Sequence, residues 1–135
     1  MRLRALRAET KGQALLEFAL ILPILLMLVL GIIEFGRVWS INERVSDATR
    51  EGARQAVIAD PTITEQQVHD FVMFRLAQAG VDTTVATVTF SQTGANWKAT
   101  GLPQTAQVHF PYSFMFFGSA FGTIQIVSSF TMRNE

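Results

Sequence analysis

Residues 12–36 read GQALLEFALILPILLMLVLGIIEFG, and this stretch decides how the chain is organised. From Ala14 to Ile33, twenty residues carry a single charge, that of Glu17. Twenty helical residues reach about 30 Å, the thickness of the hydrocarbon core of a bilayer. A single segment in lipid satisfies its own backbone polar groups only as a helix. The sequence therefore predicts a transmembrane helix over residues 13–36.

The charges on either side of this span predict its orientation. Residues 1–12 carry four basic residues against one acidic residue, a net charge of +3, whereas residues 34–135 carry seven basic and nine acidic residues. Basic residues concentrate on the cytoplasmic side of membrane spans. We therefore expect a single-pass protein of the inner (cytoplasmic) membrane, with a basic leader at residues 1–12 in the cytoplasm. The domain at residues 37–135 then lies in the periplasm or outside the cell, and its slight acidity argues against nucleic-acid binding.

Glu17 is the unusual residue of the span, because a carboxylate at a bilayer centre costs about 2.5–3.5 kcal/mol on insertion scales. Two interpretations are equally compatible with the charge alone. Glu17 is either an interfacial side chain that reaches the headgroups or becomes protonated, or a carboxylate that pairs with a cation inside an assembly.

The sequence around Glu17 resembles the processing site of type IV pilin-like proteins of the Flp/Tad type. Gly12 is followed by four residues, then by Glu17 and the aromatic Phe18. Three segments resemble the TadE-like branch, the pseudopilins or minor pilins of the Tad pilus: GQALLEFALILPILLMLVLGIIEFGR at 12–37, SDATREGAR at 46–54 and TMRNE at 131–135. Flp major pilins usually have Tyr where this chain has Phe18, which argues against a major pilin.

The resemblance implies that a prepilin peptidase cleaves between Gly12 and Gln13, so that Glu17 becomes the fifth residue. The new α-amino group, with a pKa of about 7.7–8.0 in model peptides, is then a partner for Glu17 of a neighbouring subunit. The resemblance also implies that the partners are other pilins or pseudopilins of a bacterial Tad system. The function would be pilus assembly at the base, at the tip or in priming. The alternative is an uncleaved, single-pass membrane-anchored binding or scaffold module.

The helical pattern continues beyond the membrane. Apolar and small residues recur every three or four positions from Ile41 to Ala59, and Asp60 precedes a proline that ends the run. One helix of about 45 residues, starting near Gln13, is therefore expected. Its helix-packing face consists of Ala48, Gly52 and Ala56, whose small side chains allow another backbone to come close. We favour the sheet of the same chain as the neighbour over a second subunit.

The remaining residues predict a small α+β domain. Thr62 and Glu65 have the spacing of a capping box that starts a helix ending at Gln78, with Gly80 as the stop signal. Alternating segments at 85–90, 104–110 and 123–133 predict strands. The expected fold is a long N-terminal spine helix, running from the membrane into the soluble domain, packed on a three-stranded antiparallel sheet with one additional helix.

Two aromatic features of the domain leave alternatives open. Trp97 lies in a loop rich in Gly and Pro, where we expect it to cover the core rather than contact a partner. Residues 111–122, PYSFMFFGSAFG, are apolar without a clear period. Such a segment is buried, lies on the membrane surface or forms an interface.

Catalytic chemistry is not indicated by any motif. The chain has no cysteine, and it contains neither a phosphate-binding glycine loop nor the nucleophile and zinc motifs of hydrolases. His69 and His109 fall in elements of different type, without acidic residues at ligand spacing. We therefore predict a protein that is not an enzyme and has no catalytic residues, no metal site and no cofactor.

Overall fold

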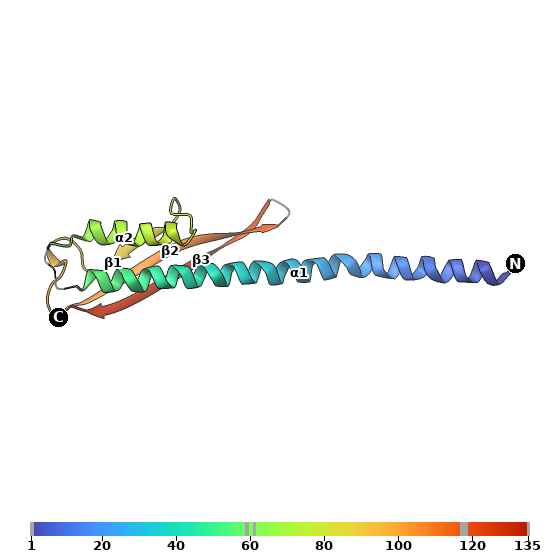
Figure 1. The fold of residues 1–135 in the computed structure, drawn as a ribbon, viewed down its shortest axis with the longest axis horizontal. Coiled ribbons are helices and arrows are strands. Elements are labelled where there is room, and N and C mark those ends of the chain that lie inside the picture. Colours follow the sequence, from blue (N-terminus) through green and yellow to red (C-terminus); the bar gives the residue numbers. More distant parts are fainter. Residues whose placement is uncertain (1, 59, 61, 117–118, 135) are drawn as a thin grey trace. The chain divides into compact units, whose positions relative to one another are not determined.

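The computed structural model describes residues 2–58, 60, 62–116 and 119–134. It consists of two helices, α1 and α2, a short 3-10 helix and three strands (Figure 1). The elements are α1 (Arg2–Ala56), α2 (Glu65–Gln78), β1 (Thr87–Phe90), the 3-10 helix (Gly94–Asn96), β2 (Pro103–Phe116) and β3 (Ser119–Arg133). This confirms the predicted α+β class with a long N-terminal helix, one further helix and a three-stranded antiparallel sheet. Contacts divide the chain into two compact units, Met1–Arg37 and Val38–Glu135.

The first unit belongs entirely to α1 in its described part. The helix begins at Arg2, so the predicted start near Gln13 is wrong. The reason is that residues 2–10 contain neither Gly nor Pro and include several Arg, Leu and Ala residues, which are good helix formers. Pro23 lies inside the helix, where it removes one backbone donor.

The first unit exposes its apolar side chains. Leu15, Ile24 and Ile32 are 70%, 68% and 64% exposed. Among the described residues, one helix is long and apolar enough to cross a membrane, with a mean hydropathy of 2.8 over its most apolar window and none of that window buried. Exposing so large an apolar surface to water is unfavourable, and a bilayer would cover it. The first unit thus fits single-pass membrane anchoring.

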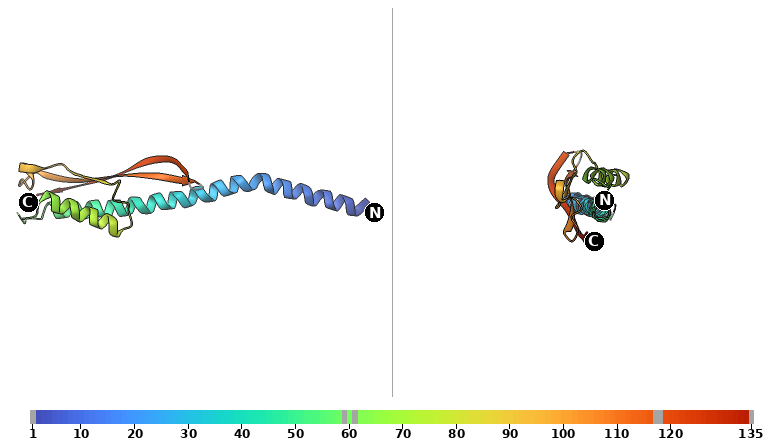
Figure 2. Two further views of the ribbon diagram at one scale, coloured as in Figure 1. Left: turned by 90° about the horizontal axis from the view of Figure 1, so that it is seen from above. Right: turned by 90° about the vertical axis from the view of Figure 1, so that its left-hand side faces the viewer.

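The second unit is a two-layer structure. The C-terminal part of α1 and the whole of α2 form one layer, and the sheet forms the other (Figure 2). The shared core consists of Val45 and Ala48 of α1, Val72 and Leu76 of α2, Val81, Val88 of β1, Val108, Phe110 and Tyr112 of β2, and Ile126 of β3. Because all these elements contribute to one core, residues 38–56 of α1 are an integral part of the fold.

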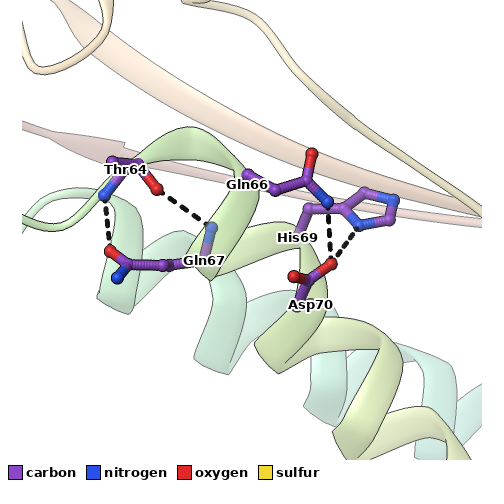
Figure 3. A network of polar contacts seen from close by, with 5 residues as sticks. All are labelled: Thr64, Gln66, Gln67, His69 and Asp70. Atoms are coloured by element: carbon purple, nitrogen blue, oxygen red, sulfur yellow. Dashed lines mark hydrogen bonds and ion pairs between the residues drawn. The ribbon is translucent and has the colours of Figure 1, made fainter.

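The turn between α1 and α2 differs from the prediction. The carboxylate of Asp60 accepts hydrogen bonds from the backbone N and Oγ1 of Thr62, at 2.8 and 2.6 Å, and these bonds lower the pKa of Asp60. Thr62 is therefore engaged before the helix begins, and the predicted capping box of Thr62 and Glu65 is wrong. The true box lies two residues further on, where Thr64 Oγ1 accepts from Gln67 N and Gln67 Oε1 accepts from Thr64 N (Figure 3).

The end of α2 follows the prediction. Gly80 has a φ of 74°, a left-handed conformation that suits glycine. The backbone N–H groups of Gly80 and Val81 donate to the carbonyls of Ala77 and Leu76, both at 3.0 Å. This is the Schellman arrangement of a helix C-terminus, so Gly80 acts as the predicted stop.

The sheet is antiparallel in the order β1-β2-β3. Val88 of β1 pairs with Val108 of β2, and Phe110 of β2 pairs with Ile126 of β3. The alternation predicted for the second strand is confirmed, because Ala106, Val108 and Phe110 lie on one face and are buried. Both long strands extend beyond their predicted bounds, since most of the apolar segment at 111–122 forms the far end of the β2–β3 hairpin.

The loop before β2 fastens the turn between the helices. Trp97 is half-buried, donates from Nε1 to the carbonyl of Ile63 at 3.0 Å and meets the ring of Phe90 edge-on. Next to it, Nζ of Lys98 donates to the carbonyls of Ile58 and Asp60 at 2.7 and 2.5 Å. Trp97 therefore packs on its own domain, as expected.

Candidate functional site

The predicted processing residues lie together on α1 in the first unit. Gly12, Gln13, Glu17 and Phe18 are all exposed, and a side chain added at Gly12 would meet no atom within 4 Å. Gln13 and Glu17 are four residues apart and therefore share one helix face, where Gln13 Nε2 donates to Glu17 Oε1 at 3.4 Å. The structure thus places the residue that would become the new N-terminus beside the carboxylate of Glu17.

The contact with Gln13 supplies no positive charge to Glu17. An amide donates a hydrogen bond but is itself uncharged. The positions three and four residues away along the helix are Gln13, Ala14, Leu20 and Ile21, none of which is a cation. A cation that pairs with Glu17 would therefore have to come from outside this part of the helix.

Glu34, near the other end of the apolar run, has a cation close to it on the same helix. Its Oε1 lies 3.0 Å from Nη1 of Arg37, three residues further along the same helix. The Glu34 side chain is only 15% exposed, whereas that of Arg37 is 63% exposed. The chain thus supplies a local cation for Glu34, whereas no cation lies three or four residues from Glu17.

The helix-packing residues lie in the second unit, and all three are buried. Ala48 and Ala56 are 4% and 1% exposed, and Gly52 between them is also buried. A Cβ added to Gly52 would collide with Cγ2 of Val72. At Gly52 the neighbour is therefore α2 of the same chain, rather than the sheet that we expected. A glycine at this position allows the close approach of α2.

Polar contacts beside this face hold the two helices together. Oε2 of Glu51 lies 2.7 Å from Nε of Arg75 on α2. Nη1 of Arg44 donates to the carbonyl of Ala79 at 2.8 Å, at the C-terminal end of α2, where a cation is favoured. Sequence reasoning missed Arg44 and Arg75, because contacts between elements distant in sequence have no local signal.

The histidines and acidic residues do not assemble into a metal site. Nδ1 of His69 and Nε2 of Gln66 both contact Oδ1 of Asp70 on the surface of α2, at 3.2 and 2.8 Å (Figure 3). His109 lies on β2, where it pairs with Thr87 and Val127 of the neighbouring strands. In the part of the chain that the structure describes, no group of three or more His, Cys, Asp or Glu side chains could hold a metal ion.

Comparison with known proteins identifies the N-terminal segment. A model of the family of TadE-like proteins matches residues 12–54, from the predicted processing site through the helix-packing residue Gly52. No match is found among curated proteins or solved structures. The match confirms the predicted resemblance to TadE-like proteins over this segment. The match supports an association of this segment with the Tad pilus.

The close approach at Gly52 gives a first prediction. Alanine normally stabilises a helix interior by about 1 kcal/mol relative to glycine. We expect Gly52→Ala to destabilise the protein instead, because overpacking against Val72 costs about 1–3 kcal/mol. Chemical denaturation of the full chain in detergent, followed by the signal of the folded domain, measures the change.

Two variants make this test specific. Gly36→Ala changes a glycine of the same helix that has no atom within 4 Å of an added Cβ, so it should not destabilise the protein. Val72→Ala should relieve Gly52→Ala, so that the double variant is more stable than the sum of the single changes by about 0.5–3 kcal/mol. Additive changes at Gly52 and Val72 would contradict the contact.

Proposed function

We propose that this protein is a minor pilin, or pseudopilin, that a prepilin peptidase processes and that acts in assembly of a Tad pilus. The observation that carries the proposal is Glu17, a carboxylate in an exposed apolar helix without a cation within one turn of it. The TadE-like match and the single apolar helix support the same interpretation. Residues 1–12 are the leader, residues 13–36 are the membrane anchor and residues 37–135 face the periplasm or the exterior.

Cleavage between Gly12 and Gln13 would create the missing cation. The α-amino group of a new N-terminus has a pKa of about 7.7–8.0 and is largely protonated at neutral pH. The side chain of Gln13 already reaches Glu17 of its own chain, which shows that both residues lie on one face. In an assembly, the amino group of one subunit and Glu17 of the next would attract each other strongly, because the low dielectric of lipid weakens screening.

This pairing would fix the axial register of neighbouring subunits. An unpaired charge in lipid is costly, and a shift of one helix along the other would separate the two charges. The domains of neighbouring subunits, which begin near Val38, would then follow each other along the assembly at a regular spacing. We propose that it contacts other pilus proteins at the base, at the tip or during priming.

One observation favours the alternative, an uncleaved single-pass anchored binding or scaffold module. Helix α1 begins at Arg2 and runs through Gly12 without a break, so the Gly12–Gln13 bond lies inside a helix. A peptidase would have to unwind this segment before cutting it. The glycine helps, because it costs a helix about 1 kcal/mol relative to alanine.

Replacement of Gly12 separates the two functions. We expect Gly12→Leu to block cleavage, since a bulky side chain would occupy the position before the scissile bond. The protein from membranes that contain the peptidase should then keep its twelve-residue leader, as seen by intact mass. Gly31→Leu, a change of another exposed glycine in the same helix, should leave cleavage intact. A parent protein that retains the leader in such membranes would contradict the proposal and favour the uncleaved module.

Replacement of Glu17 tests its role in assembly. Glu17→Gln keeps the shape of the side chain and removes its charge, so membrane insertion should be at least as good as in the parent. We expect the processed variant to lose contact with neighbouring subunits, measured as loss of cross-linking between single cysteines introduced near the start of the span. Glu34→Gln is the matched control, because Glu34 forms an ion pair with Arg37 of the same chain. Equal cross-linking in Glu17→Gln and the parent would contradict the pairing.

A further inference from the structure

The β2–β3 hairpin extends beyond the rest of the sheet. β1 pairs with β2 only over Thr87–Phe90, opposite Ala106 to His109. Past that point, β2 and β3 continue as a two-stranded ribbon, which we call the hairpin arm: residues 110–116 and 119–126 (Figure 1). The base of the arm packs on the core through Phe110, Tyr112 and Ile126. Its far end has no third strand beside it, and two strands alone are marginally stable in water, so this end is a candidate for contact with something outside the domain.

A β-bulge near the end of the arm presents an aromatic side chain. Phe114 pairs with Gly122, but Met115 pairs with Ala120, so Phe121 is an extra residue in β3. Bulges re-aim side chains and are common at functional positions. Phe121 is 87% exposed and Met115 is 50% exposed, which makes this end of the arm apolar on its surface.

The arm also lacks the charges that keep strand edges soluble. No Asp, Glu, Lys or Arg occurs between Lys98 and Arg133. β3 is an edge strand of the sheet, and the edge strands of soluble proteins usually carry charged residues that prevent unwanted pairing. The composition of the arm therefore suits an apolar environment better than water.

Within the second unit, the arm lies beside the part of α1 that is nearest in sequence to the apolar run. Ile41 of α1 lines one hollow with Pro111 and Tyr112, whereas Arg50 lies over the ring of Phe130, 4.8 Å from its centroid. Following β3 from Phe130 back to the arm thus leads along α1 towards Val38, where the helix enters this unit. In the sequence, the apolar run ends at Ile33, only five residues before Val38.

We propose that the end of the hairpin arm, represented by Met115 and Phe121, inserts into the surface of the bilayer that holds the apolar part of α1. The covalent connection keeps this surface close to the domain, so its effective concentration is high, whereas a second copy must first be recruited. The contact is apolar, so it does not depend on anionic lipids or on salt. The inference rests on the membrane anchoring in the proposed function, but not on cleavage or on the pairing of Glu17.

A fluorescent label tests the insertion, because the chain has no cysteine of its own. The full chain with Phe121→Cys, labelled with an environment-sensitive dye, is reconstituted into phosphatidylcholine vesicles at low protein density. We expect blue-shifted emission, protection from iodide and quenching by lipids that carry a nitroxide near the headgroup. The matched control is Phe74→Cys on α2, another apolar residue, which is 59% exposed and should behave as if in water.

The outcomes separate lipid from other partners. Lipid quenching at position 121 that is unchanged in high salt and independent of protein density supports the proposal. Iodide access equal to that at position 74 would overturn it. Protection that grows with protein density without lipid quenching would assign the arm to a second copy and also overturn it. A chain that fails to stay with the vesicles would instead contradict the membrane anchoring itself.

Discussion

The structure depends on one constraint: the side chains of a single helix have to suit lipid along one part and pack into a folded core along another. From Ala14 to Ile33, α1 offers apolar side chains in all directions, which is the pattern of a helix that lipid surrounds. From Val45 to Ala56 its small residues lie on one face, where Ala48, Gly52 and Ala56 are buried by the rest of the domain. The side-chain pattern of α1 therefore changes between the apolar run and the part that packs in the domain.

The two parts of the helix use their polar residues in different ways. In the folded unit, Glu51 finds its cation, Arg75, on another element of the same chain. In the apolar part, Glu34 finds Arg37 within the same helix, but no cation lies within one turn of Glu17. Charges in lipid are costly unless they are paired. Glu17 therefore differs from Glu34 and Glu51, each of which has a cation of its own chain.

Sequence patterns predicted the features that depend on local or periodic signals. The long apolar helix, the alternation of β2 and the stop at Gly80 are of this kind. The predicted capping box failed because Asp60 engages Thr62 through a turn, a competition that spacing alone does not reveal. The bulge at Phe121 and the contact of Gly52 with Val72 depend on strand register and on packing between distant segments, so they required the structure.

Cysteine accessibility along α1 in native membranes tests the central claim most directly, since the parent chain has no cysteine. Leu25 and Arg54 are both exposed on the isolated chain, so only a bilayer distinguishes them. In sealed membranes whose outer face is accessible, Arg54→Cys should react with a water-soluble maleimide and Leu25→Cys should not. Equal reaction at both positions would contradict a helix that is held in lipid at one end and built into a folded domain at the other.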